Sequence, residues 1–202
     1  AALEIVHELA GANVSVVSPQ SDWALVAATR FQLRNIDITL PALGVPVFGV
    51  NYGADMKLER TLHGRKVSGV GTAGHLSILP PDDCTRWVFD KPGDIALVFL
   101  NRNLFDEAIE AAGGRRPTSV EIVPQFVIRD LTLERIAHQL LKKISDPIWD
   151  STLRTELLAQ QLAEHLLQFH SNLDLGQPSR PHTMAPNKLK RAEDFMASNL
   201  EN

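Results

Sequence analysis

The stretch DIALVFL, residues 94–100, is apolar at every position after its first residue, so both faces of an extended strand there are hydrophobic. Strands with two apolar faces are typical of the middle of a sheet, where other layers cover both sides. Other segments are apolar only at alternate positions, which indicates strands with one buried and one polar face. They span residues 36–40, 56–62, 76–78, 87–89 and 120–128. Because turn residues such as Gly64 and Gly74 separate these short segments, we predict an antiparallel barrel or sandwich.

The second half of the chain has a different composition and a different period. Eleven of the twelve glycines precede residue 115, and none lies between residues 115 and 175. Glycine weakens helices, so the first part is expected to be strand and turn and the second helical. Apolar residues recur at helical spacing from Asp130, which with Thr132 is a candidate cap, to Asp146-Pro147. The same spacing predicts a second helix from about Ser151 to His170.

The overall composition narrows the class of protein. With 202 residues, 44% of them hydrophobic and 22% charged, the chain has the composition of a folded protein. Its single cysteine, Cys84, excludes an internal disulfide and fits a reducing compartment. The sequence shows no apolar run long enough to cross a membrane and no secretory signal, so we expect a cytoplasmic protein without a membrane partner. The net charge of −4 argues against nucleic-acid binding by the whole surface, and all of this excess precedes residue 171.

Two segments near the C-terminus follow the predicted helices. Residues 171–186 contain three prolines, one glycine and several polar residues, which is a linker composition. Residues 187–202 return to helical spacing, which predicts one amphipathic helix without a partner of its own. Because a single helix cannot bury its apolar stripe, we expect this helix to open a truncated further domain.

The order of these parts resembles the N-terminal region of AraC-family transcriptional regulators over nearly the whole chain. The pieces that carry the resemblance are SDWALVAATRF (21–31), LERTLHGRKVSG (58–69), GHLSILPPDDCTRWVF (74–89), DIALVFLNRNLFDEA (94–108), RDLTLERIAHQLLKKI (129–144), TLRTELLAQQLAEHLLQFH (152–170) and NKLKRAEDFMASNLEN (187–202). Residues 94–108 look like a barrel strand and the turn after it. The family often has Gly-Asp and Pro-Pro-Gly around the third piece, where this chain has Gly74-His75 and Pro80-Pro81-Asp82. Aspartate also favours turns, so the turn is kept.

The resemblance implies a mainly β fold with α-helices and four parts. Residues 1–130 would form a cupin-like antiparallel β-barrel of the jelly-roll type that senses an effector, and residues 131–170 two helices for packing and dimerisation. Residues 171–186 would be the linker, and residues 187–202 the first helix of a helix-turn-helix domain. DNA would then be bound only through the missing part of that domain, so we place no DNA-binding residue in this chain. The basic residues Lys188, Lys190 and Arg191 are interpreted as a solvated helix start.

The histidines do not have the spacing of a cupin metal site, which uses two histidines one residue apart, then a glutamate and a later histidine. His63 and His75 are twelve residues apart, and no His-x-His occurs. On the predicted helices, His165 and His170 are five apart, whereas a spacing of four would make them face one ligand. We therefore predict no metal and no cofactor.

Nucleophilic catalysis has equally little support in the sequence. Cys84 follows Asp82 and Asp83, whose negative charges disfavour a thiolate, and Ser77 has no base that the sequence can assign. We therefore predict no catalytic residue and a protein that is not an enzyme. A cupin-type enzyme with an atypical or absent metal is the alternative, and a dimerisation module with a solid barrel core is a third possibility.

Five residues are candidates for a small-molecule site. Trp87 and Phe89 share the apolar face of one segment, and Phe48 and Tyr52 share parity on another. Aromatic walls are typical of small-molecule pockets, although such residues more often belong to a plain core. Arg60 lies on the apolar face of its segment, so it needs an anionic ligand or a buried acid unless it reaches water at the strand end.

The second predicted helix is the candidate dimer interface. Its leucines can pack on their own barrel or on a second copy, and the resemblance favours a homodimer. These leucines are Leu153, Leu157, Leu158, Leu162 and Leu166.

Overall fold

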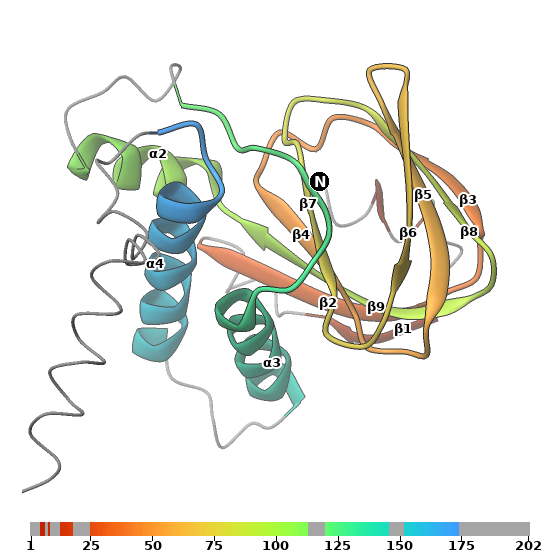
Figure 1. The fold of residues 1–202 in the computed structure, drawn as a ribbon. Helices are drawn as coiled ribbons and strands as arrows, with labels where there is room; N and C mark the ends of the chain where they lie inside the picture. The colour runs from red at the N-terminus through yellow and green to blue at the C-terminus, as the bar shows by residue number, and fades with distance from the viewer. Residues whose placement is uncertain are drawn as a thin grey trace, which may run out of the picture.

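The computed structural model describes residues 5, 6, 8, 13–17, 25–112, 120–145 and 152–173. Most of the predicted linker, residues 174–186, and the predicted helix at 187–202 lie outside these ranges. Two β-sheets face each other, and three labelled helices lie together along one side of them (Figure 1). The predicted architecture of a mainly β, cupin-like pair of antiparallel sheets followed by helices is confirmed.

Strand pairing is antiparallel throughout both sheets of the described chain. The larger sheet has the order β1 (Asn13–Val17), β2 (Val26–Leu33), β9 (Gly93–Leu100), β4 (Val47–Asn51), β7 (Leu76–Leu79) and β10 (Gln125–Ile128). The smaller sheet has the order β3 (Asp37–Leu40), β8 (Thr85–Phe89), β5 (Met56–Leu62) and β6 (Arg65–Gly71). At the β5–β6 hairpin, His63 and Gly64 have positive φ angles of 49° and 73°, which suit a type I′ turn.

Strand β9 has a neighbour on each edge and a packed layer on each face, as its sequence predicts. It pairs with β2 and β4, so Val98 lies opposite Ala28 on one side and Phe48 on the other. Ala96 and Val98 belong to a core with the helices, whereas Leu97 and Phe99 belong to a core between the sheets. The two apolar faces of this strand therefore serve two different cores.

We name these two cores by what encloses them. The helix-side core lies between the larger sheet and the helices and includes Val98 together with the fully buried Leu162 and Leu166. The inter-sheet core lies inside the barrel and includes Leu58 from the smaller sheet and Phe99 from the larger one. Because the larger sheet contributes to both cores, it is the layer on which the whole structure is built.

The two predicted helices are present with nearly the expected ends. Helix α3 (Leu131–Ser145) follows Asp130, whose Oδ1 accepts hydrogen bonds from the backbone N–H groups of Thr132 (2.9 Å) and Leu133 (3.0 Å). This is the N-cap arrangement that the sequence indicates. Helix α4 (Thr152–Phe169) follows, and both helices pack on the outer face of the larger sheet (Figure 1). Among the described residues, no helix is long and apolar enough to cross a membrane.

The prediction of strand and turn alone for the first half is wrong after β9. Helix α2 (Arg102–Ala111) follows β9 directly, where only a turn is expected from the sequence. Asn101 begins it by accepting a hydrogen bond from the N–H of Asn103 at 2.8 Å. Phe105 and Ile109, one helical turn apart, are buried in the helix-side core. Tertiary burial of this one apolar face is enough to make a ten-residue helix.

The single long strand expected over residues 120–128 is also corrected. Only β10, from Gln125 to Ile128, joins the larger sheet, and Ile122 makes an isolated bridge to Ser171. Pro124 has no N–H to donate, and Val127 has a positive φ of 50°, so the regular ladder is interrupted on both sides of Gln125. Val120 and Ile122 are instead buried in the helix-side core.

Candidate functional site

A cavity of about 80 Å³ lies between the two sheets, inside the barrel. Its walls are almost entirely apolar and include Phe31, Met56, Trp87, Phe89 and Leu97. Where polar groups reach the wall they already have partners within the chain. The Ser77 hydroxyl, for example, accepts a hydrogen bond from the N–H of Val127 at 3.1 Å. The cavity is therefore suited to an apolar molecule or an apolar part of one.

Arg60 does not line this cavity itself but packs on Trp87, one of the residues of its wall. Its side chain is only 7% exposed, and its guanidinium lies 5.8 Å from the ring centre of Trp87 and 5.5 Å from that of Phe126. It donates one hydrogen bond, from Nη1 to the backbone oxygen of Gln125 at 3.0 Å. Its Nε has no partner, and no carboxylate within the described ranges pairs with it. Burial lowers the pKa of Arg60, which is the expected effect of holding an uncompensated positive charge in an apolar place.

Three of the five predicted pocket residues lie together. Trp87 and Phe89 line the cavity with their rings stacked, 6.3 Å apart and inclined by 10°, and Arg60 rests on Trp87. Phe48 and Tyr52 lie apart from them on the other side of the larger sheet, where Phe48 is fully buried in the helix-side core. We therefore remove Phe48 and Tyr52 from the candidate site.

Tyr52 has an unusual environment of its own. Its hydroxyl is buried and has no hydrogen-bond partner among the described residues, and burial raises its pKa to about 12. The Arg30 guanidinium lies 4.8 Å from the ring centre and is held there by two hydrogen bonds to the Asp94 carboxylate, of 2.9 and 2.7 Å. Tyr52 therefore supports the wall of the barrel from outside and does not reach the cavity.

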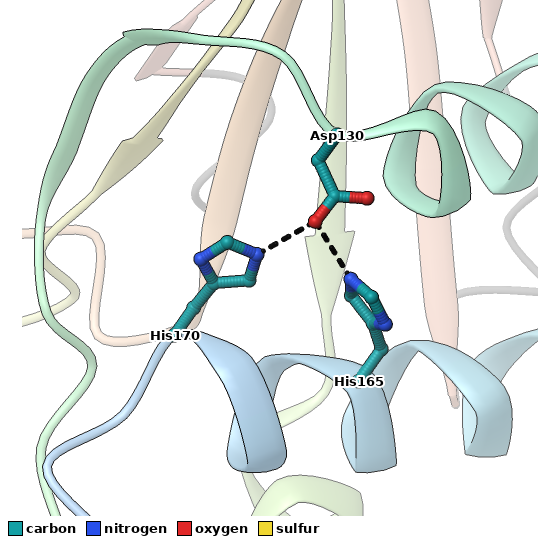
Figure 2. A group of neighbouring side chains, drawn as sticks. All are labelled: Asp130, His165 and His170. Atoms are coloured by element: carbon teal, nitrogen blue, oxygen red, sulfur yellow. Dashed lines mark hydrogen bonds and ion pairs between the residues drawn. The ribbon is translucent and has the colours of Figure 1, made fainter. Parts of the chain in front are cut away.

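A second cluster, which the sequence does not predict, joins Asp130, His165 and His170 (Figure 2). Asp130 Oδ2 accepts hydrogen bonds from His165 Nε2 at 2.7 Å and from His170 Nε2 at 2.9 Å. Burial alone would raise the pKa of Asp130, but the hydrogen bonds from His165, the N–H of Leu133 and His170 lower it to about 2. The carboxylate is therefore ionised at neutral pH, and it ties the start of α3 to the end of α4.

The spacing argument against these histidines fails because it assumes one continuous helix. Helix α4 ends at Phe169, so His170 is the first residue beyond the helix. The imidazole of His170 can therefore point back towards the carboxylate that His165 also reaches, as Figure 2 shows. Nothing in the sequence pairs them with Asp130, which lies 35 and 40 positions earlier.

The other residues considered for metal binding or catalysis remain scattered. His63 is exposed and its Nε2 lies 2.7 Å from Asp83 Oδ1, at the opposite end of β5 from Met56. His75 borders the cavity, and its Nδ1 accepts a hydrogen bond from the N–H of Thr72 at 3.2 Å. Cys84 is exposed. The structure therefore does not bring these groups together into one site.

The predicted interface leucines divide into two sets. Leu158, Leu162 and Leu166 are buried in the helix-side core of their own chain. Leu153 and Leu157 are 64% and 60% exposed at the start of α4. Of the five leucines, only Leu153 and Leu157 are accessible to a partner, so the predicted interface is reduced to these two residues.

Comparison with known proteins gives a likeness of fold only. No protein-family model matches the chain, and no curated protein matches it in sequence. The EutQ protein of Clostridium difficile is 12% identical, with 44% of this chain and 67% of that chain covered and a TM-score of 0.37. HEPD of Streptomyces albus, with 2-hydroxyethylphosphonate and Fe(II) bound, is 13% identical over 46% of this chain and 22% of its own, with a TM-score of 0.35. A mutant of oxalate decarboxylase OxdC of Bacillus subtilis is 16% identical over 47% of this chain and 30% of its own, with a TM-score of 0.31.

The expectation that the chain is not an enzyme is contradicted, because structures with a similar fold include oxalate decarboxylase and oxalate oxidase. Identities and TM-scores this low assign no reaction to this chain, and none of these comparisons points to the AraC family or to a helix-turn-helix domain. The chain and these proteins have in common a cupin-like arrangement of two antiparallel sheets.

Proposed function

We propose that this chain is the effector-sensing and dimerisation region of an AraC-like DNA-binding transcriptional regulator. The observation that carries the proposal is the apolar cavity inside the barrel, together with the buried Arg60 that packs on the wall residue Trp87 and has no carboxylate partner in the described chain. In this proposal, DNA is read by a domain outside the described residues, and the helices carry the signal towards it. Ligand binding would shift the population of helix arrangements.

The effector that suits this site is a small, mostly apolar molecule with one anionic group. The cavity supplies apolar walls, and the guanidinium of Arg60 would supply the charge-assisted hydrogen bonds that a carboxylate or phosphate needs. A designed apolar cavity of about 150 Å³ accommodates benzene, so the present volume of about 80 Å³ fits only a few heavy atoms without adjustment. The flexible Met56 side chain in the wall is the natural place for that adjustment.

Dimerisation is proposed to use the start of α4. Leu153 and Leu157 lie one helical turn apart and are both exposed, so they form a short apolar stripe that nothing in the described chain covers. A two-fold axis through this stripe would pack each α4 against its copy, and it would place two DNA-reading domains for a two-part operator.

A fusion assay tests sensing and dimerisation together. The chain is fused to a repressor DNA-binding domain that represses a reporter gene only when it is dimerised. We expect repression with the intact chain, loss of repression with Leu153→Asp/Leu157→Asp, and a change in repression when small aromatic or aliphatic carboxylates are supplied. A coiled-coil fusion to the same domain is the positive control.

The proposal fails if the fusion never represses while the coiled-coil control does. It fails equally if no carboxylate, phosphate or neutral analogue in a broad metabolite panel changes either repression or the Tm of the purified chain. If an Arg60→Met fusion still responds to carboxylates, Arg60 does not bind the effector. The proposal about dimerisation is not affected by that result.

A further inference from the structure

We propose that Asp130, His165 and His170 form a binding site for a divalent transition metal, with Zn²⁺ as the best chemical match. The site lies between the start of α3 and the end of α4, outside the barrel cavity. It is independent of the proposed sensing function, because neither the cavity nor the exposed stripe of α4 uses these three side chains.

The donor atoms already converge on one point. His165 Nε2 and His170 Nε2 lie 2.7 and 2.9 Å from the same Asp130 oxygen, and one donor atom from each of the three residues lies within 4.8 Å of the others. Ligand atoms of a tetrahedral zinc site are about 3.3 Å apart, as follows from metal–ligand bonds of about 2.0–2.1 Å. Movements of about 1 Å or less would therefore open the two short N···O contacts to make room for an ion.

The donor set selects the kind of ion. Two neutral imidazoles and one carboxylate suit Zn²⁺ and its first-row neighbours, whereas Ca²⁺ and Mg²⁺ prefer oxygen ligands. Three protein ligands leave a fourth position for water. His165 and Asp130 each keep 14% of the side chain exposed, so an ion has a path from solvent.

Each ligand is positioned by contacts that do not involve the ion. The other oxygen of Asp130, Oδ1, caps α3 through the N–H groups of Thr132 and Leu133, which fixes the carboxylate. The ring of His165 packs on that of Phe169, with centres 4.8 Å apart. The N–H of His170 donates to Leu166 O at 2.9 Å. A site whose ligands are held in place loses little conformational freedom when an ion binds.

Metal binding also changes which ring nitrogen carries a proton. Without an ion, each imidazole donates its Nε2–H to the shared carboxylate oxygen. An ion bound at Nε2 takes the place of that proton, so the neutral imidazole that ligates the metal carries its proton on Nδ1. The Nδ1 of His170 is buried and has no partner among the described residues. An N–H at this position needs a hydrogen bond to a water molecule or to a side chain that has moved. This requirement lowers the affinity for the metal but does not prevent binding.

The test uses the full chain after treatment with a chelator. Zn²⁺ is titrated by calorimetry, and Co²⁺ by its visible absorption, which reports tetrahedral coordination. We expect one ion per chain and a rise in Tm on metal binding. His165→Gln, His170→Gln and Asp130→Asn should each weaken binding at least tenfold. Asp130→Asn is the decisive variant, because asparagine still caps a helix but is a poor zinc ligand.

His138→Gln is the matched control, because His138 is exposed on α3 and belongs to no cluster described above. Its affinity for Zn²⁺ should equal that of the unchanged chain. The proposal is overturned if the metal-free chain takes up neither ion, or if Asp130→Asn, folded by circular dichroism, binds as tightly as the original. In either case the three side chains form a hydrogen-bond network only.

Discussion

Three buried side-chain atoms lack a hydrogen-bond partner within the described ranges, and each lies in a different place. The Tyr52 hydroxyl belongs to the helix side of the barrel wall, the Arg60 Nε lies inside the barrel, and the His170 Nδ1 lies at the α3–α4 junction. Leaving a buried polar group unsatisfied costs about 1–3 kcal/mol. Because Arg60 carries a permanent positive charge that no carboxylate in the described chain compensates, it is the group that most favours an anionic partner.

Replacing Tyr52 by phenylalanine should not destabilise the chain. The hydroxyl has no partner to lose, so Tyr52→Phe is expected to leave the free energy of unfolding unchanged or raise it by about 1 kcal/mol. Urea denaturation measures the change. A loss of more than about 1 kcal/mol would show that the hydroxyl is satisfied in solution, for example by a bound water.

Replacing Arg60 by methionine should remove the cost of a buried charge. We expect the free energy of unfolding to stay the same or rise by about 1 kcal/mol, because the lost hydrogen bond and ring contacts offset part of the gain. Arg86→Met is the control, since Arg86 is exposed and pairs with Asp37 at the surface. A clear destabilisation by Arg60→Met in urea would mean that this arginine is satisfied within the chain, which would weaken the case for an anionic effector.

Single residues could be assigned to a face from the sequence but not always to a core. The alternation of apolar and polar residues correctly assigns Trp87, Phe89 and Arg60 to the inner face of the smaller sheet. It succeeds because the strands of this sheet, β5 and β8, are buried on one face only. The same argument misplaces Phe48, because β4 is buried on both faces and parity does not say which face meets the cavity.

At the scale of elements, Asp130 links helix α3 to helix α4 through its two carboxylate oxygens. Oδ1 caps α3, and Oδ2 receives the imidazoles at the end of α4. The orientation of the two helices therefore depends on one ionised side chain as well as on their apolar contacts. This arrangement has a measurable pH dependence.

The pKa of Asp130 is lowered to about 2 from an ordinary value of 3.8, so the unfolded chain binds more protons than the folded chain between these pH values. The stabilisation is complete above about pH 4 and is lost as the pH falls towards 2, with a total of about 2 kcal/mol. In the metal-free chain, the stability difference between the original and Asp130→Asn should therefore shrink over this range. A difference for Asp130→Asn that stays constant from about pH 5 to pH 2 would contradict the assignment.

The exposed stripe of α4 gives a prediction about assembly. Leu153→Asp/Leu157→Asp should convert a dimer into a monomer in sedimentation at micromolar concentration, while the unfolding of the monomer changes by less than about 0.5 kcal/mol per site. Leu131→Asp, on the equally exposed Leu131 of α3, tests whether any surface leucine has this effect. An unchanged chain that is monomeric at every concentration would rule out the interface.

Long periodic elements were predictable from the sequence, and short or interrupted ones were not. Helices α3 and α4 follow directly from their apolar spacing and from the Asp130 cap. Helix α2 is short and begins right after a buried strand, so its two apolar contacts, Phe105 and Ile109, do not stand out. The His165–His170 pair was missed for a related reason, since the end of α4 decides where His170 points.

At the scale of the whole molecule, the larger sheet is shared by the helix-side core and the inter-sheet core. The sequence predicts the two layers, but not that strands as distant as β1 and β10 belong to one sheet, because such pairings depend on the complete topology. A shared sheet should also make the barrel and the helices unfold together.

A substitution on the helix side should therefore weaken the barrel as well. Leu162→Ala, at a fully buried position, is expected to cost about 2–5 kcal/mol and to lower the urea midpoint seen by Trp87 fluorescence and by circular dichroism equally. Trp23→Phe and Trp149→Phe isolate the Trp87 signal. Gln161→Ala, on the same helix but exposed and outside the proposed dimer stripe, should leave both midpoints nearly unchanged. Separate transitions for the two probes would show that barrel and helices are independent units.

The alternation of β9 between two cores also bears on how such a chain can diverge. Leu97 and Phe99 shape the space inside the barrel, whereas the neighbouring Ala96 and Val98 hold the helices in place. Substitutions that alter chemical preference and substitutions that alter assembly therefore fall on different residues of one strand. During evolution, substitutions at Leu97 and Phe99 can therefore change which molecule fits inside the barrel. The arrangement of the helices is kept as long as Ala96 and Val98 are unchanged.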